Sequence, residues 1–206
     1  MIENREYSDS MTIIELFLKR IFDIFVSVLG MLILSPSFLI ITLSLLIQGE
    51  GSVIFRQKRL GYKGKSFYIY KFRSMKVDAE NRGPQLTNRV DFRLTKVGYL
   101  LRYSHLDELP QLWNVLVGEM SFVGPRPERE YFIKKILMED PRYPQLFKIR
   151  PGITSPATLY NGYTDTMGKM LKRLQMDLDY MESRTLWLDF KIIIKTVLPI
   201  LRGEKI

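Results

Sequence analysis

The hydrophobic pattern separates an apolar N-terminal segment from a longer remainder of mixed polarity. Residues 24–47 contain no charged side chain, and a helix of about 20 residues is long enough to cross ~30 Å of hydrocarbon. Ser35 and Pro36 interrupt this segment near its midpoint. A proline inside a helix removes one backbone hydrogen bond and clashes with the preceding turn. Hydropathy alone therefore allows two topologies, a spanning helix or a bent segment that enters and leaves the bilayer by the same face.

The polar and apolar pattern after this segment predicts a small α+β domain that is mostly helical. Residues 52–59 and 66–72 have the composition of two short strands, and the glycine-containing residues 61–65 form a turn between them. Residues 78–91 are polar, contain Gly83-Pro84 and predict a mobile loop. Helices are expected to begin near Asp107, Glu128, Thr166 and Thr185.

The C-terminal residues 186–202 have the period of an amphipathic helix. Three cations, Lys191, Lys195 and Arg202, fall on one narrow stripe, and apolar side chains fill the rest of the surface. Such a helix either packs into the core on most sides or lies in a membrane interface with its cations toward lipid phosphates. The pattern leaves both possibilities open.

The charge distribution favours an anionic membrane surface. The net charge is +9, and residues 55–76 carry eight Lys or Arg side chains and no acid. Basic residues beside an apolar segment place the adjoining domain in the cytoplasm, and an anionic membrane surface explains them. The sequence has no helix-turn-helix pattern, zinc-ligand spacing or RNA-binding aromatic signature, so we expect no nucleic-acid partner. The absence of cysteine excludes disulfides and a thiol nucleophile.

The run from Ser104 to Leu116, followed by Gly124-Pro125-Arg126-Pro127, carries the clearest chemical signal. Asp107 has the position of an N-cap, and Glu108 follows in the first turn of the expected helix. Two acids at the positive end of a helix dipole can hold a divalent cation or present an ionised nucleophile. Taken alone, the pair could also be an ordinary acidic cap on a core helix.

Three motifs in one order resemble the bacterial sugar transferase family. They are the Asp107 run, the preceding Tyr70-Lys71-Phe72-Arg73-Ser74-Met75 and the following Arg150-Pro151-Gly152-Ile153-Thr154. The resemblance covers roughly Lys19 to the C-terminus. It implies a small monotopic phosphoglycosyl transferase that moves a phosphosugar from a UDP-sugar to polyprenol (undecaprenyl) phosphate, releases UMP and initiates membrane glycoconjugate assembly. The implied location is the cytoplasmic face of the bacterial inner membrane.

The resemblance also implies roles for individual residues. Asp107 matches the nucleophile that forms a covalent aspartyl phosphosugar. Glu108 matches a second acid that assists Mg²⁺ or positions the incoming phosphate, and Asp107 and Glu108 would together ligate the metal. The expected phosphate-binding cations are Lys71, Arg102, Arg126 and Arg150, and the expected supporting residues are Asp177 and Tyr180.

Several nearby residues receive weaker expectations. His105, the single histidine, is expected to have a structural or substrate-tuning role because a carboxylate nucleophile needs no general base. Arg129 is expected to be only a neighbour of Arg126. Asp177 would support an active-site arginine or, equally, form an ion pair on a helix surface. Ser155-Pro156 departs from the family's usual continuation after Thr154, which suggests a subgroup with its own sugar preference.

The predicted organisation has three parts. Residues 1–18 form a polar N-terminal segment, residues 19–48 a re-entrant membrane hairpin that breaks at Ser35 and Pro36, and residues 49–206 a cytoplasmic catalytic domain that ends in the amphipathic helix. Two alternative functions stay open on the residues alone. They are a non-catalytic basic adaptor at a membrane surface and a metal-dependent phosphohydrolase. The donor sugar and the oligomeric state are not specified.

Overall fold

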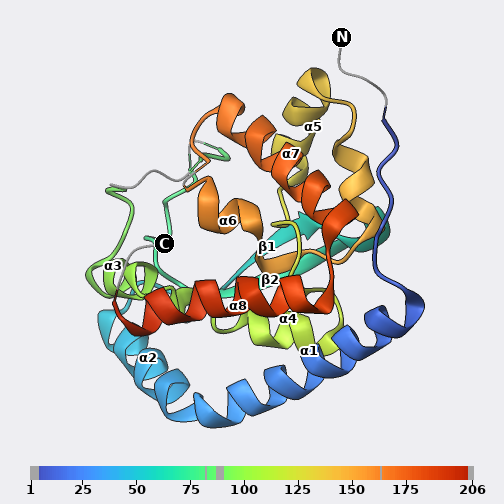
Figure 1. Ribbon diagram of the computed structural model, residues 1–206. Helices are drawn as coiled ribbons and strands as arrows, with labels where there is room; N and C mark the ends of the chain where they lie inside the picture. Colours follow the sequence, from blue (N-terminus) through green and yellow to red (C-terminus); the bar gives the residue numbers. More distant parts are fainter. Residues whose placement is uncertain (1–4, 82, 87–90, 163, 204–206) are drawn as a thin grey trace.

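The computed structural model describes residues 5–81, 83–86, 91–162 and 164–203 (Figure 1). The chain opens with two long helices, α1 (Ile13–Ile33) and α2 (Ser35–Gln48), which bend by 60° at their junction. The bend lies at the predicted Ser35–Pro36 break, where Pro36 occupies the first turn of α2 and the Ser35 hydroxyl donates to the Leu32 carbonyl at 2.8 Å. Helix α1 starts at Ile13, ahead of the expected hairpin at 19–48, because Thr12 and Glu15 form a capping box.

Helix α1 buries polar side chains and exposes apolar ones. Lys19, Asp23 and Ser27 are spaced by four residues and are buried against the rest of the molecule. The opposite side presents large apolar side chains, among them Phe25 at 65% exposure. Within the described chain, neither helix alone is long and apolar enough to cross a bilayer, but the bent pair meets the length and composition test as a unit.

The β-hairpin predicted at residues 52–72 is confirmed. Strand β1 (Ile54–Leu60) pairs antiparallel with β2 (Ser66–Phe72), and the 3-10 turn η1 (Tyr62–Gly64) connects them. The register places Phe55 opposite Lys71 and Gln57 opposite Ile69. Since side chains alternate across a strand, Lys71, Gln57 and Arg59 point to the same face of the hairpin.

A second, parallel strand pair was not predicted. Strand β3 (Ser121–Val123) pairs with β4 (Gly152–Thr154), and Gly152 belongs to the motif Arg150-Pro151-Gly152-Ile153-Thr154, for which no strand was predicted. The two backbone segments lie so close here that a Cβ at Gly152 would be 2.1 Å from the Gly124 nitrogen. This contact fixes the path of the Gly124–Pro127 loop, which carries Arg126.

The remaining described elements are helical, and all but α7 and α8 are short. They are α3 (Lys96–Tyr103), η2 (Leu106–Glu108), α4 (Gln111–Val117), α5 (Glu130–Glu139), η3 (Tyr143–Lys148), α6 (Pro156–Tyr160), α7 (Met167–Ser183) and α8 (Leu186–Leu201). The starts of α7 and α8 agree with the prediction, since the hydroxyls of Thr166 and Thr185 accept from the amides of Lys169 and Leu188.

The expected helix start at Asp107 is wrong. Asp107 lies in the 3-10 turn η2, and α4 begins only at Gln111 after Pro110. His105 has a φ of 56°, in the left-handed region, so the chain turns before η2 instead of entering a regular helix. The start expected near Glu128 falls slightly later, with Arg129 as the N-cap of α5.

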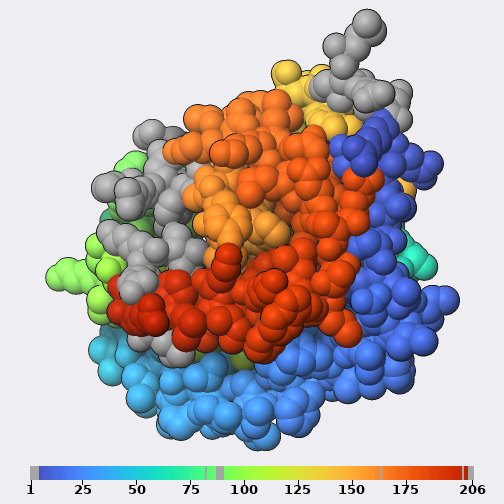
Figure 2. Space-filling view, in the orientation of Figure 1, coloured from blue at the N-terminus to red at the C-terminus, as the bar shows by residue number. Residues whose placement is uncertain are grey.

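The main core lies between α5, α7 and η3 and includes side chains from β3 and α8. From α8, Ile192 enters this core, whereas Trp187 and Phe190 are exposed. Helix α8 is therefore not a core helix on most of its sides. Figure 2 shows it crossing one face of the molecule directly above α1 and α2. Of the loop expected at 78–91, residues 82 and 87–90 lie outside the described residues.

Candidate active site

The two acids project from the turn η2, and Glu108 is held by two cations. One oxygen of Glu108, Oε1, accepts from Lys71 Nζ at 2.5 Å and from an Arg126 guanidinium nitrogen at 3.0 Å. Asp107 is only 6% exposed. Two adjacent carboxylates in this turn thus meet Lys71 from strand β2 and Arg126 from the Gly124–Pro127 loop. The two cations are far from the acids, and from each other, in sequence.

The neighbouring acids have opposite pKa shifts. Burial raises the pKa of Asp107, and the Lys71 ammonium only partly offsets this effect. Burial would also raise the pKa of Glu108, but the charges of Lys71 and Arg126 outweigh it and lower that pKa well below its usual range. Glu108 is therefore the permanently ionised partner of the cations, whereas Asp107 is the acid whose charge depends more on what else enters the site.

The predicted cations do not all gather at the acids. Lys71 and Arg126 contact Glu108, and Arg102, on α3, lies close enough to lower the pKa of Asp107. Arg150 lies elsewhere. Its Nε donates to the Gly118 carbonyl at 3.0 Å, and its guanidinium covers the Tyr62 ring at 5.3 Å, at the C-terminal end of α4.

The supporting residues also separate. Tyr180 donates to Asp189 at 2.5 Å, and Asp189 pairs with Lys19, so these residues join α7 and α8 to α1. Asp177 is 1% exposed, which rules out the surface ion pair. Burial raises its pKa to about 7, although Arg173, the Ser155 hydroxyl and the Arg126 backbone amide act in the opposite direction. Asp177 thus lies behind the loop that carries Arg126.

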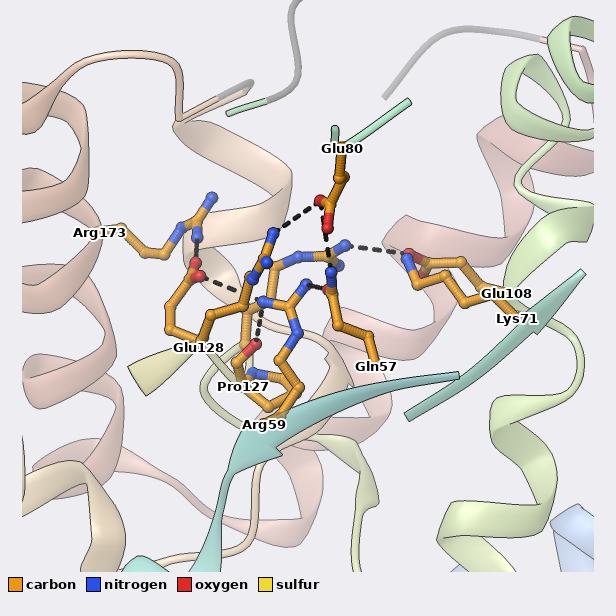
Figure 3. A network of polar contacts seen from close by, with 10 residues as sticks. Gln57, Arg59, Lys71, Glu80, Glu108, Pro127, Glu128 and Arg173 are labelled. Carbon is orange, nitrogen blue, oxygen red and sulfur yellow. Dashed lines mark hydrogen bonds and ion pairs between the residues drawn. The ribbon is translucent and has the colours of Figure 1, made fainter. Parts of the chain in front are cut away.

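A buried ion network next to the acids was missed by the sequence analysis. Glu128 pairs with Arg173 and, at 3.3 Å, with Arg59, whose guanidinium also donates to the Pro127 carbonyl at 3.1 Å (Figure 3). Arg129, expected to be only a neighbour, donates to Glu80 at 2.6 Å. The sequence could have pointed to Arg59, because side chains alternate along β1 and Arg59 therefore lies on the same face of the β-hairpin as Lys71.

The acid pair provides oxygen ligands for a divalent cation but not a complete site. Within the described residues, no group of three or more His, Cys, Asp or Glu side chains could hold a metal. Mg²⁺ is commonly bound through one or two carboxylates together with substrate phosphates. Asp107 and Glu108 fit that donor set, in which a phosphorylated substrate would supply the other oxygens.

The buried carboxylates and the cations that converge on them form a polar site whose donors suit phosphate oxygens. Comparison with known proteins gives the family. Residues 14–203 match the model described as bacterial sugar transferase. The chain belongs to the bacterial sugar transferase family.

Two relatives are similar to nearly the whole chain. A UDP-glucose:undecaprenyl-phosphate glucose-1-phosphate transferase of Klebsiella pneumoniae is 42% identical over 186 residues, which cover 89% of this chain and 40% of the relative. A UDP-N-acetylgalactosamine-undecaprenyl-phosphate N-acetylgalactosaminephosphotransferase of Aeromonas hydrophila is 38% identical, over 91% of this chain and 44% of the relative. The chain thus spans less than half the length of these two proteins.

A third relative has a similar length to this chain. The exopolysaccharide production protein PSS of Rhizobium leguminosarum bv. phaseoli is 39% identical over 197 residues, which cover 93% of this chain and 98% of the relative. The described fold therefore corresponds to nearly the whole of one relative and to part of the others.

Proposed function

We propose that this protein transfers a phosphosugar from a UDP-sugar to undecaprenyl phosphate, through a covalent intermediate on Asp107. The observation that carries the proposal is the buried Asp107 beside Glu108, whose carboxylate holds Lys71 and Arg126. The two transferases named above act on UDP-sugars and undecaprenyl phosphate. Family membership and site geometry thus support the same reaction.

The reaction has two displacements. In the first, a carboxylate oxygen of Asp107 forms a bond to the phosphorus that carries the sugar, and the bond from that phosphorus to the UMP oxygen breaks. UMP leaves with the electron pair. In the second, a phosphate oxygen of undecaprenyl phosphate attacks the same phosphorus and releases Asp107. Each step needs the attacking and leaving oxygens roughly in line.

The other residues supply charge and position. Lys71 and Arg126, which contact Glu108, would bind the oxygens of the transferred phosphate, and Arg102 is close enough to favour the ionised form of Asp107. Asp107 and Glu108 would hold Mg²⁺ jointly with the diphosphate, and the metal would neutralise charge on the leaving group. Glu108 keeps both cations at the correct place when the substrate is absent.

The proposal includes a location at the cytoplasmic face of a bacterial inner membrane, with α1 and α2 as a re-entrant hairpin. A helix that buries Lys19, Asp23 and Ser27 and exposes apolar side chains suits an apolar surrounding. The exposed apolar side of α8 would lie in the membrane interface, with its lysines near lipid phosphates.

Intact-protein mass spectrometry tests the covalent step. The purified protein is incubated with Mg²⁺ and a panel of UDP-sugars without acceptor, next to Asp107→Asn. With at least one donor, we expect the wild type to gain the mass of one phosphosugar and to release UMP. The variant should show neither. Release of free sugar phosphate without an acceptor would instead indicate a phosphohydrolase. Failure to release any nucleotide with acceptor present, and retained membrane binding, would favour an adaptor.

A further inference from the structure

The polar surface continues along the hairpin face beyond Lys71 to Gln57, Glu80 and Arg129. We propose that these three residues form the subsite that binds the sugar hydroxyls of the donor. This inference rests on the proposed function, because it assumes that the phosphorus attacked by Asp107 also carries the sugar.

The position of the subsite follows from the register. The sugar is bonded directly to the phosphate that Lys71 and Arg126 would hold, so its ring must lie next to them. Gln57 is the diagonal neighbour of Lys71 on the same face of the hairpin, because Phe55 lies opposite Lys71. Diagonal neighbours are roughly 7–8 Å apart, a separation that one phosphosugar can bridge.

The side chains of this group are held in place by one another. The Gln57 carbonyl Oε1 accepts from Arg59 at 2.6 Å, and its amide Nε2 lies 3.5 Å from Glu80 Oε1. The same Glu80 oxygen accepts from Arg129 at 2.6 Å. Figure 3 shows Glu80 approaching from above this group, with Gln57 below it and Glu108 to one side.

The charges favour a neutral ligand. Glu80 and Arg129 cancel, Gln57 carries no charge, and Arg59, which donates to Gln57, is paired with Glu128. The cations next door, Lys71 and Arg126, outnumber the one carboxylate, Glu108, that they contact. A second phosphate would gain little here. A carboxylate, a guanidinium and an amide provide acceptors and donors together, which suits hydroxyl groups that both donate and accept. The Glu80 side chain is 37% exposed, so this end of the group is open to solvent.

The test compares donors that differ in the configuration at C4 or in the substituent at C2 of the sugar. Glu80→Gln and Arg129→Lys are assayed for UMP release with UDP-glucose, UDP-galactose, UDP-N-acetylglucosamine and UDP-N-acetylgalactosamine, with undecaprenyl phosphate as acceptor. A site built to hydrogen-bond a hydroxyl strongly rejects the analogue that lacks it. We expect at least one variant to change the ratio of kcat/KM between C4 epimers by about tenfold or more, while Asp107 still forms its adduct.

Glu130→Gln is the matched control. Glu130 is close to Arg129 in sequence, but it pairs with Lys134 at 2.8 Å on the exposed side of α5. This variant should leave the donor ratios unchanged. Thermal unfolding of all variants checks that each is folded.

Three results would overturn the subsite. One is an equal loss of kcat/KM for every donor, which indicates general positioning. Another is a kcat/KM in both variants that equals the wild-type value for every donor. The third comes from a parallel assay of CMP release from the CDP form of one of these sugars. A changed preference between its UDP and CDP forms, with unchanged epimer ratios, indicates a nucleotide subsite. A wild-type protein that releases UMP from no donor would refute the proposed function itself, and the subsite with it.

Discussion

At the scale of single residues, the site separates two acids that are adjacent in sequence. Glu108 gains two cations and stays ionised, so it cannot easily leave them to attack phosphorus. Asp107 is buried with less compensation, and the pKa of its carboxyl is raised. A carboxylate that is weakly compensated is the better nucleophile of the two. The division of roles that we propose for Asp107 and Glu108 thus has a physical basis in their neighbours.

Asp177 gives a residue-scale prediction of pH dependence. Its folded-state pKa is raised from 3.8 to about 7, so the folded protein keeps a proton that the unfolded chain loses. Stability should therefore fall as pH rises from about 4 to 7, by at most about 4 kcal/mol, and stay level above that range. In Asp177→Asn this fall should disappear. The free energy of unfolding of the variant minus that of the wild type should therefore increase from pH 5 to pH 8.

Thermal unfolding at several pH values measures this effect. Asp179→Asn is the control, since Asp179 is an exposed residue of the same helix. Parallel pH curves for wild type and Asp177→Asn would show that the Asp177 carboxyl is not the titrating group.

At the scale of elements, local patterns predicted the parts that local physics determines. Strand alternation gave the hairpin, and Thr166 and Thr185 gave two helix starts through their side-chain caps. The parallel pair β3 and β4 was not predictable in this way, because three-residue strands have no visible period. Their partners lie some thirty residues apart in sequence. The start of α4 was misplaced because a left-handed His105 diverts the backbone before Asp107.

The same limit applies to the site. Lys71, Arg126 and the acid pair were found through motifs, and the structure brings them together. Glu128 was missed because only partners on other elements, Arg59 and Arg173, reveal its role. Arg59 was missed although the alternation of β1 places it on the face of Lys71. Arg150 was assigned to a phosphate by its motif, but its contacts lie at the end of α4.

Asn114 provides the element-scale prediction, because it joins α4 to the strand that carries Lys71. Its side chain accepts from the Tyr70 amide at 3.2 Å and donates to the Tyr68 carbonyl at 2.7 Å, and it is fully buried. Asn114→Ala leaves these backbone groups unpaired, at a cost of about 1–3 kcal/mol. Each kcal/mol corresponds to roughly 2–4 °C in Tm at this chain length. We expect a lower Tm and a lower kcat, since Lys71 loses its support.

Differential scanning fluorimetry and a UMP-release assay measure the two effects. Asn81→Ala serves as the reference because Asn81 is exposed. If both variants lose the same small amount of stability, Asn114 does not join the two elements.

At the scale of the whole molecule, the N-terminal segment argues for re-entrance. Tyr7 is buried in the main core, Asp9 pairs with Arg184, and the Ser10 hydroxyl donates to the Arg184 carbonyl at 2.7 Å. These contacts hold the residues before α1 on the globular domain. A spanning α1–α2 pair would place them on the opposite side of the bilayer and break every one of these contacts.

Cysteine labelling tests this topology, because the chain has no cysteine of its own. Single variants Ser8→Cys, before α1, and Ser66→Cys, on the hairpin, both replace exposed residues. In spheroplasts, a membrane-impermeant maleimide should label neither, and after permeabilisation it should label both. Leu39→Cys on α2 should resist labelling in both conditions, because a re-entrant α2 would place its exposed side chain in lipid. Labelling of Ser8→Cys in intact spheroplasts, with Ser66→Cys still protected, would mean that α1 and α2 cross the membrane together.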